Sequence, residues 1–327
     1  MKSFRTELQL KSSIFIFGLR DSIFTIGSCF ADEIGTELSQ KKFKTSINTL
    51  GVIYNPLSIH RALHYSLKAI SPKEETYVQQ GGLWNNYEFH SSFSAPTKEE
   101  ITLKIKQAII TAHDFLSETE VLMITYGTAW AFERIDNGEL VANCHKVDSK
   151  NFHKILQTPA QIEESFHELY QELKSVKKSI KIILTVSPVR HIKDTLELNQ
   201  VSKSVLRLAC YNIQNKYSDV VYFPAYEIMI DDLRDYRFYE PDMIHPSHEA
   251  IEYIWDKFSN HYFDDSTKDF IRQWKSISVD LQHRAFHPHA EAHQKFLKET
   301  LRKLEALRYV VNVENEIALV TSNLTKS

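Results

Sequence analysis

The stretch that most constrains the fold is residues 24–32, Phe-Thr-Ile-Gly-Ser-Cys-Phe-Ala-Asp. Residues 22–26 are apolar and partly β-branched, which predicts a short buried strand. Residues 31–40 predict a helix, because Ile34 and Leu38 lie four positions apart. Ser28 therefore lies where a strand ends and a helix begins. In an open α/β sheet this edge binds ligands, and a helix N-terminus there favours anions.

The rest of the chain alternates strand and helix patterns. Continuous apolar runs predict buried strands at residues 121–126, 181–186 and 220–224, and residues 43–48 predict another. Helices are predicted near residues 56–70, 97–116, 158–178, 196–216 and 249–258. Residues 14–17 predict an edge strand, and residues 73–97 predict a long ordered loop. This alternation predicts a parallel sheet with helices on both faces, a three-layer α/β/α fold.

The pattern changes near residue 264. Residues 268–308 are charged and amphipathic, with helical spacing and no strand signal. We expect an α/β domain over residues 1–263 that carries the site, and a C-terminal helical extension over residues 264–327 that packs on its core.

Composition narrows the class of protein. The net charge of the 327 residues is −3, which gives no electrostatic reason to expect a nucleic-acid partner. The three cysteines form no Cys-x-x-Cys pair, and no apolar run reaches the roughly 18 residues of a membrane span. The N-terminus has no apolar run of signal-peptide length, so we expect a cytoplasmic protein without a membrane span.

No cofactor or metal is expected. The sequence contains no Walker motif, dinucleotide glycine fingerprint or EF-hand. Histidines cluster at positions 283, 287, 289 and 293, but Pro288 interrupts any helix there and no further ligand set is evident.

A serine nucleophile needs a histidine base and usually a carboxylate that orients it. The stretch Pro-Asp-Met-Ile-His-Pro-Ser at residues 241–247 offers both, because Asp242 and His245 lie three apart and can project to one side. Structural alternatives remain: Ser28 is also a natural helix N-cap, Asp242 a cap and His245 a surface residue. Cys29 is a rival nucleophile. Because adjacent side chains at a strand end point apart, only one of Ser28 and Cys29 can face the pocket.

Three stretches together resemble the GSCFA family: Gly-Ser-Cys-Phe-Ala at residues 27–31, Leu-Gly-Val-Ile-Tyr-Asn-Pro-Leu-Ser-Ile at 50–59 and Asn-Cys-His-Lys at 143–146. That family resembles the SGNH hydrolases, which are esterases, lipases and acyl transferases with a flavodoxin-like sheet. The resemblance covers roughly residues 20–260. It implies that Ser28 is the nucleophile, His245 the general base and Asp242 its orienting partner, without a metal.

Two features depart from the SGNH pattern. No aspartate precedes Ser28, and the strand end at residues 127–130 lacks the asparagine that helps to hold the oxyanion. We expect oxyanion donors in the N–H groups of Ser28 and Gly51, with either Thr128 or Asn48.

Further residues are candidates for substrate contacts. His145 is either a substrate ligand or second base, or a structural histidine, and His90 is a similar but weaker candidate. Trp130 and Trp84 either line an acyl or sugar pocket or belong to the core.

The sequence thus predicts a serine-dependent ester hydrolase or O-acyl transferase that acts on a small-molecule or glycan ester. Two alternatives stay open. One is a glycan-binding protein that keeps this fold with little or no catalysis, which the missing motif residues favour. The other is thiol chemistry at Cys29.

Overall fold

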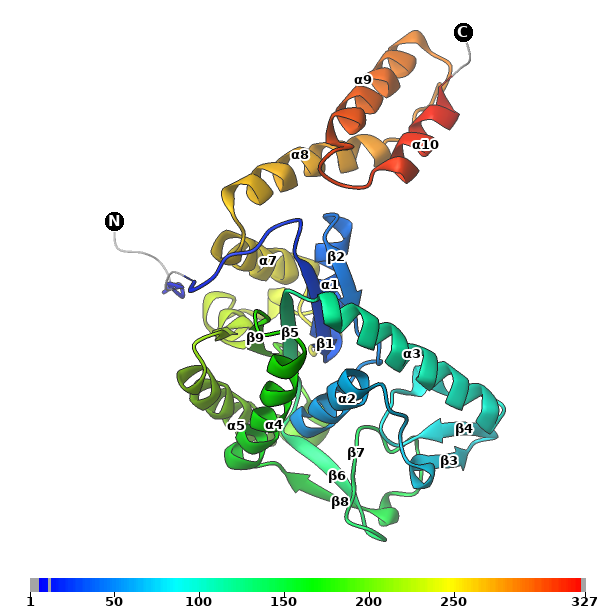
Figure 1. Cartoon of the computed structure of the whole chain (residues 1–327). Helices are drawn as coiled ribbons and strands as arrows, with labels where there is room; N and C mark the ends of the chain where they lie inside the picture. The colour runs from blue at the N-terminus through cyan, green and yellow to red at the C-terminus, as the bar shows by residue number, and fades with distance from the viewer. Residues whose placement is uncertain (1–5, 11–12, 325–327) are drawn as a thin grey trace.

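The computed structural model describes residues 6–10 and 13–324. At its centre lies a parallel five-stranded sheet in the order β10-β9-β5-β1-β2 (Figure 1). Its strands are β1 (Ser22–Gly27), β2 (Lys44–Ile47), β5 (Val121–Tyr126), β9 (Lys181–Val186) and β10 (Val220–Phe223). The predicted parallel α/β sheet is therefore confirmed.

The chain direction across the sheet reverses beside β1. The chain passes from β1 to β2 on one side and returns to β5 on the other, with Gly27 of β1 paired to Thr125 of β5. The connections at the carboxyl ends of β1 and β5 therefore leave in opposite directions. Such a switch point opens a crevice at that edge, which is where ligands bind in open α/β sheets.

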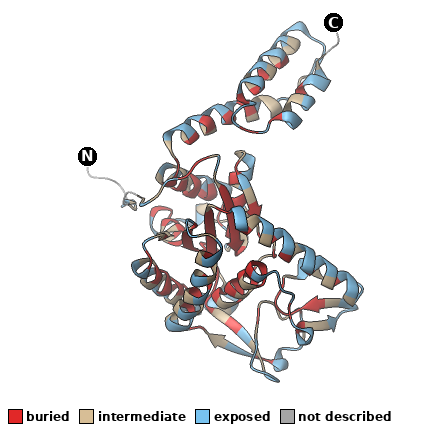
Figure 2. Cartoon of the chain, viewed as in Figure 1, coloured by how far each residue is buried: buried red, intermediate tan, exposed pale blue. Residues whose placement is uncertain are grey.

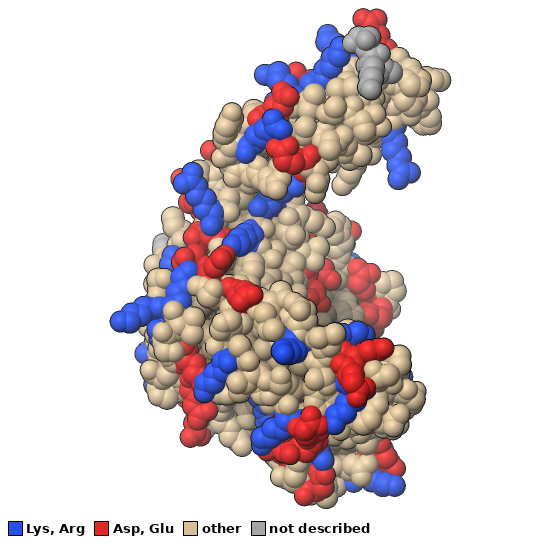
Figure 3. Space-filling model, turned by 45° about the vertical axis from the view of Figure 1, so that its right-hand side comes forward, with Lys and Arg blue, Asp and Glu red and all other residues tan. Residues whose placement is uncertain are grey.

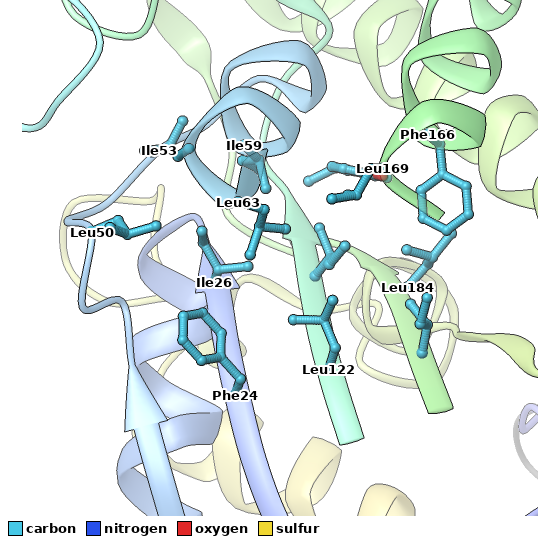
Figure 4. Packing of buried hydrophobic residues seen from close by; sticks show 14 of the residues in the cluster. Phe24, Ile26, Leu50, Ile53, Ile59, Leu63, Leu122, Phe166, Leu169 and Leu184 are labelled. Carbon is cyan, nitrogen blue, oxygen red and sulfur yellow. The ribbon is translucent and has the colours of Figure 1, made fainter. Parts of the chain in front are cut away.

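Helices cover both faces of the sheet and make three layers. Alternate residues of each strand face opposite layers, so Phe24 and Ile26 contact one layer while Ile23 contacts the other. The first layer contains α2 (Pro56–Lys68), α3 (Lys98–Glu118), α4 (Pro159–Val176) and α5 (Thr195–Lys216). The second contains α1 (Cys29–Gln40) and α7 (His248–Tyr262). Figure 2 shows the buried residues concentrated in the sheet, and Figure 4 shows the packing on the first face.

Local sequence fixes where several helices begin. Pro56 occupies the first turn of α2, where its missing N–H costs nothing, and the Asn55 side chain accepts from Ser58 N at 3.0 Å. At the start of α4, Thr158 accepts from the N–H of Gln161, and the Gln161 side chain accepts from the N–H of Thr158 at 2.8 Å. This reciprocal capping box satisfies two N–H groups that a helix leaves unpaired.

We expect Thr158→Ala to lower the free energy of unfolding by about 1 kcal/mol, because it leaves an N–H of α4 without its acceptor. Chemical denaturation followed by circular dichroism measures the change. Thr321→Ala, an exposed threonine within α10, is the control and should change stability by less than about 0.5 kcal/mol. Equal effects of the two substitutions would contradict the capping argument.

Two secondary-structure predictions are wrong. The predicted loop at residues 73–97 contains an antiparallel hairpin, β3 (Tyr77–Gln80) and β4 (Leu83–Asn86). Its turn uses Gly81 and Gly82 at φ of 60° and 77°, the left-handed backbone that tight hairpin turns need. The predicted edge strand at residues 14–17 is only a single bridge from Phe17 to Phe263.

A second small sheet lies beyond the carboxyl edge. Its strands are β6 (Trp130–Arg134), β7 (Leu140–Val141) and β8 (Phe152–Leu156), in the order β7-β6-β8. The Asp-Asn-Gly stretch at residues 136–138 lies in the connection between the antiparallel strands β6 and β7. The short helix α6 (Ala225–Glu227) follows β10.

The C-terminal helices form an arm that extends away from the sheet (Figure 1). The arm consists of α8 (Asp265–Gln282), α9 (Glu291–Leu307) and α10 (Glu314–Asn323), which share an apolar cluster of their own. It touches the end of α1, where Trp274 Nε1 donates to Gln40 O at 2.7 Å and Lys42 pairs with Glu316 at 2.5 Å. The expected start of the extension coincides with Asp264, the N-cap of α8.

Acidic and basic side chains are interspersed on the face shown in Figure 3. Within the described residues, no helix combines the length and the apolarity needed to cross a membrane.

Candidate active site

Gly27 ends β1 and allows the chain to turn sharply towards α1. Its φ is +137°, and a Cβ atom there would lie 2.1 Å from Thr125 O. The backbone beyond it is held on both sides, because Ser28 N donates to Thr125 O at 3.1 Å and Ile53 N donates to Gly27 O at 2.9 Å. The start of α1 is thereby fixed between β5 and the loop before α2.

Ser28 is the N-cap of α1, but its side chain makes no cap hydrogen bond. The residue is fully buried, and its Oγ has no hydrogen-bond partner in the described part of the protein. Gly127 gives it room, because a Cβ atom at Gly127 would lie 3.2 Å from Ser28 Cβ. Ser28 and His245, which the sequence predicts to act together, are therefore not hydrogen-bonded.

Cys29 is the first residue of α1 and is only partly buried. Burial raises the pKa of its thiol above the usual value, and the nearby carboxylates of Asp32 and Glu33 raise it further. The thiol is therefore protonated at neutral pH. Reaction at Cys29 would need a base to take its proton.

Asp242 and His245 form the hydrogen-bonded pair that their spacing predicts. The Asp242 carboxylate contacts His245 Nδ1 at 2.7 Å, and its other oxygen accepts from the N–H groups of Ile244 and His245 at 2.8 and 3.0 Å. These bonds fix the His245 ring and leave Nε2 as the nitrogen that can exchange a proton.

Electrostatic interactions link the Asp242–His245 pair to α1 and to the loop after β9. His245 acts electrostatically on Glu33, which lies one turn after Cys29, and on His191, which lies in the loop after β9. The Asp242–His245 pair and the β1–α1 junction therefore border one region of the carboxyl edge.

The Asp242–His245 contact also predicts how the pKa of the Asp242 carboxyl responds to a substitution. The His245 side chain, followed by the backbone N–H groups, lowers the pKa of the Asp242 carboxyl to about 2. We expect His245→Ala to move this pKa upward, towards the usual value near 3.8. An NMR titration that follows the carboxyl carbon of Asp242 measures this pKa. The exposed Asp136 is the control, because His245→Ala should leave it unchanged. An unchanged Asp242 titration would contradict the contact.

The groups predicted as oxyanion donors make hydrogen bonds inside the protein. The Gly51 N–H donates to Asn48 O at 2.7 Å, and the Ser28 N–H donates to Thr125 O. The Asn48 side chain accepts from Gly27 N at 2.8 Å and donates to Asp32 at 2.7 Å. These bonds stabilise the loop after β2 rather than leave free donors.

The hydroxyl of Thr128 also makes hydrogen bonds inside the protein. Its hydroxyl lies 2.9 Å from Ser202 Oγ and accepts from Trp130 N at 3.1 Å. Sequence reasoning could not find these partners because Ser202 is far away in the chain.

The other predicted ligands lie in two places. His145 is buried, its Nε2 contacts Asn86 O at 2.7 Å, and its Nδ1 has no partner among the described residues. His90 is an electrostatic neighbour of both His145 and Asp32, so these two histidines border the β1–β2 side of the edge. Trp130 is partly buried at the other side, with Nε1 donating to Leu198 O at 3.2 Å.

The comparison with known families agrees with the motif stretches. Residues 22–258 match the GSCFA family, which is most of the α/β part. The chain belongs to the GSCFA family. Residues 274–326 match the family described as the GSCFA domain protein, C-terminal domain, which corresponds to most of the arm. No curated protein matches the sequence.

The structure of this GSCFA protein also shows residues that sequence reasoning missed. The Tyr54 ring lies 5.5 Å from the His191 ring, and Tyr54 is an electrostatic neighbour of Cys29. Burial, assisted by the charges of Lys203 and His245, lowers the pKa of His191 to about 3, so His191 is neutral. These side chains connect the Cys29 side of the edge with the His245 side.

Two histidines of the arm lie near each other. The His283 and His293 rings lie 5.9 Å apart, and the described residues contain no group of three or more side chains placed to hold a metal ion.

Proposed function

We propose that this GSCFA protein transfers acyl groups, either hydrolysing an ester of a small molecule or glycan or passing the acyl group to an acceptor hydroxyl. The observation that carries the proposal is the 2.7 Å contact of Asp242 with His245, a histidine that also acts electrostatically on Glu33 of α1. Acyl transfer requires a histidine oriented in this way and a nucleophile that it can reach at the same switch point.

The strand order supports the resemblance to SGNH hydrolases. Counting only the parallel strands, the order is 2-1-3-4-5, which is the flavodoxin-like arrangement. In the SGNH pattern the nucleophile follows the first strand and the Asp-x-x-His pair lies near the end of the domain. Ser28 and Cys29 match the first position, and Asp242 and His245 match the second.

The reaction would proceed in two steps. The hydroxyl of Ser28 or the thiol of Cys29 attacks the acyl carbonyl, and its proton passes to His245 Nε2. The tetrahedral intermediate collapses to an acyl-enzyme while His245 returns the proton to the departing alcohol. Water or an acceptor hydroxyl then attacks the acyl-enzyme, with His245 as base, and releases the free nucleophile.

Hydrolysis of a panel of p-nitrophenyl esters, from acetyl to longer chains, tests the proposal. We expect His245→Ala to lower kcat/KM by about 10²–10⁴-fold, the usual contribution of a general base. His248→Ala is the matched control, because His248 is a nearby exposed histidine whose Nε2 lies 3.7 Å from the Glu252 carboxylate. Equal activity of the two variants, or no turnover of any ester by the unaltered protein, would refute the proposal.

The engagement of the predicted oxyanion donors favours a second candidate, a glycan-binding protein with little catalysis. Such a protein would bind acylated glycans on an array without turning them over. His245→Ala would then leave turnover absent in both proteins, which separates this candidate from the enzyme.

A further inference from the structure

Lys203 is a buried lysine at the centre of the carboxyl edge. It lies on α5, is 1% exposed, and its Nζ donates to Gly127 O at 2.8 Å and to Ser187 O at 2.7 Å. Within the described part of the chain, no carboxylate pairs with it. A lysine in this setting is unusual, because burying an ammonium group without a counter-charge is costly.

The two hydrogen bonds of Lys203 Nζ equal the number that a neutral amine can donate. Burial lowers the pKa of Lys203 to about 7, so the charged and neutral forms are both populated near neutral pH. A neutral amine has two N–H groups, and the structure supplies two carbonyl acceptors. The charged form carries a third N–H and a positive charge.

The two carbonyls belong to the two halves of the candidate site. Gly127 follows β5, packs against Ser28, and its N–H donates to Tyr54 O at 2.8 Å. Ser187 follows β9 and begins the loop that leads to Arg190. The N–H of Arg190 donates to Ile244 O at 3.2 Å, directly before His245.

Several titratable groups face this amine. Cys29 approaches from α1 and His191 from the loop after β9, and both are electrostatic neighbours of Lys203. The Tyr226 ring on α6 lies 5.7 Å from Nζ. His245 acts on His191 in turn. A change of charge at Lys203 therefore acts on Cys29 and on His191.

We propose that Lys203 is a positioning residue that joins the two halves of the candidate site and makes the reactivity of Cys29 depend on pH near neutrality. The proposal rests on the proposed function only in treating Cys29 and His245 as parts of one site. Lys203 joins the two halves through its hydrogen bonds to the carbonyls of Gly127 and Ser187, and its charge acts on Cys29.

An NMR titration of the full chain with ¹³C-labelled lysine tests the first part without any substitution. We expect one lysine Cε resonance to titrate near pH 7, while exposed lysines titrate near their usual value of about 10.4. If every lysine titrates above pH 9, Lys203 does not change charge near neutrality and the proposal is overturned.

Alkylation of Cys29 by iodoacetamide tests the second part. In a Cys144→Ser background, which removes the other partly buried thiol, the rate is measured between pH 5.5 and 9. We expect Lys203→Met to slow alkylation several-fold at pH 6, where Lys203 is charged and favours the thiolate. The difference should shrink as the pH rises through 7.

Lys216→Met is the matched control, since Lys216 is an exposed lysine on the same helix. An identical rate change at every pH would show a role confined to packing and would overturn the proposal. Neither measurement requires ester turnover. An inactive protein whose Lys203 titrates near pH 7 would therefore refute the proposed function and leave this inference standing.

Discussion

Replacing Cys29 with alanine is expected to lower ester turnover by about 10⁴–10⁶-fold, the loss seen when a nucleophile is removed. Ser28→Ala is expected to cost far less. The reason is access, because Cys29 is partly exposed at the first turn of α1 whereas Ser28 is fully buried with an unpartnered Oγ. The sequence pattern alone favours Ser28, so this expectation reverses that preference.

Steady-state rates and intact-mass labelling with iodoacetamide and a fluorophosphonate separate the two residues. Labelling that disappears in Cys29→Ala and persists in Ser28→Ala assigns the thiol. Cys144→Ala is the control, because Cys144 is partly buried in the loop that carries His145. Loss of turnover in Ser28→Ala alone would contradict the expectation and show that Ser28 becomes exposed when substrate binds.

Gly27→Ala is expected to destabilise the fold by more than about 4 kcal/mol, among the largest effects of a single substitution. The new Cβ would lie 2.1 Å from the backbone oxygen of Thr125, and neither atom can move without breaking the pairing of β1 with β5. The φ of +137° adds backbone strain.

Denaturant unfolding of both proteins measures this cost. Gly138→Ala is the matched control, because Gly138 has a positive φ of 71° but nothing within 4 Å of the added Cβ. It should cost only the strain of a left-handed alanine, about 1–2 kcal/mol. Similar losses for the two variants would mean that the contact with Thr125 does not contribute.

Much of the fold follows from local sequence. The apolar runs of β5 and β9 have no alternation, and strands buried on both faces need none, so their positions and the parallel sheet were predictable. The β3–β4 hairpin was not predicted, because its strands are short and polar and Gly81-Gly82 suits a loop equally well.

The site was predictable only where its parts lie close in sequence. Asp242 and His245 are three residues apart and do form a hydrogen bond. Lys203 lies on the buried stripe of α5, between Asn199 and Leu206, so its spacing was a usable signal. What lies opposite that stripe depends on the order of strands, which local periodicity does not specify.

The placement of β1 between β5 and β2 has a consequence during synthesis. Every residue of β1 is buried in the folded protein, yet its neighbour β5 emerges only after residues 28–120 have been made. At roughly 5–20 residues per second this takes on the order of 5–20 s. During that interval the nascent chain presents an apolar strand that can pair with β2 on one edge but lacks its partner on the other, the kind of segment that chaperones shield from aggregation.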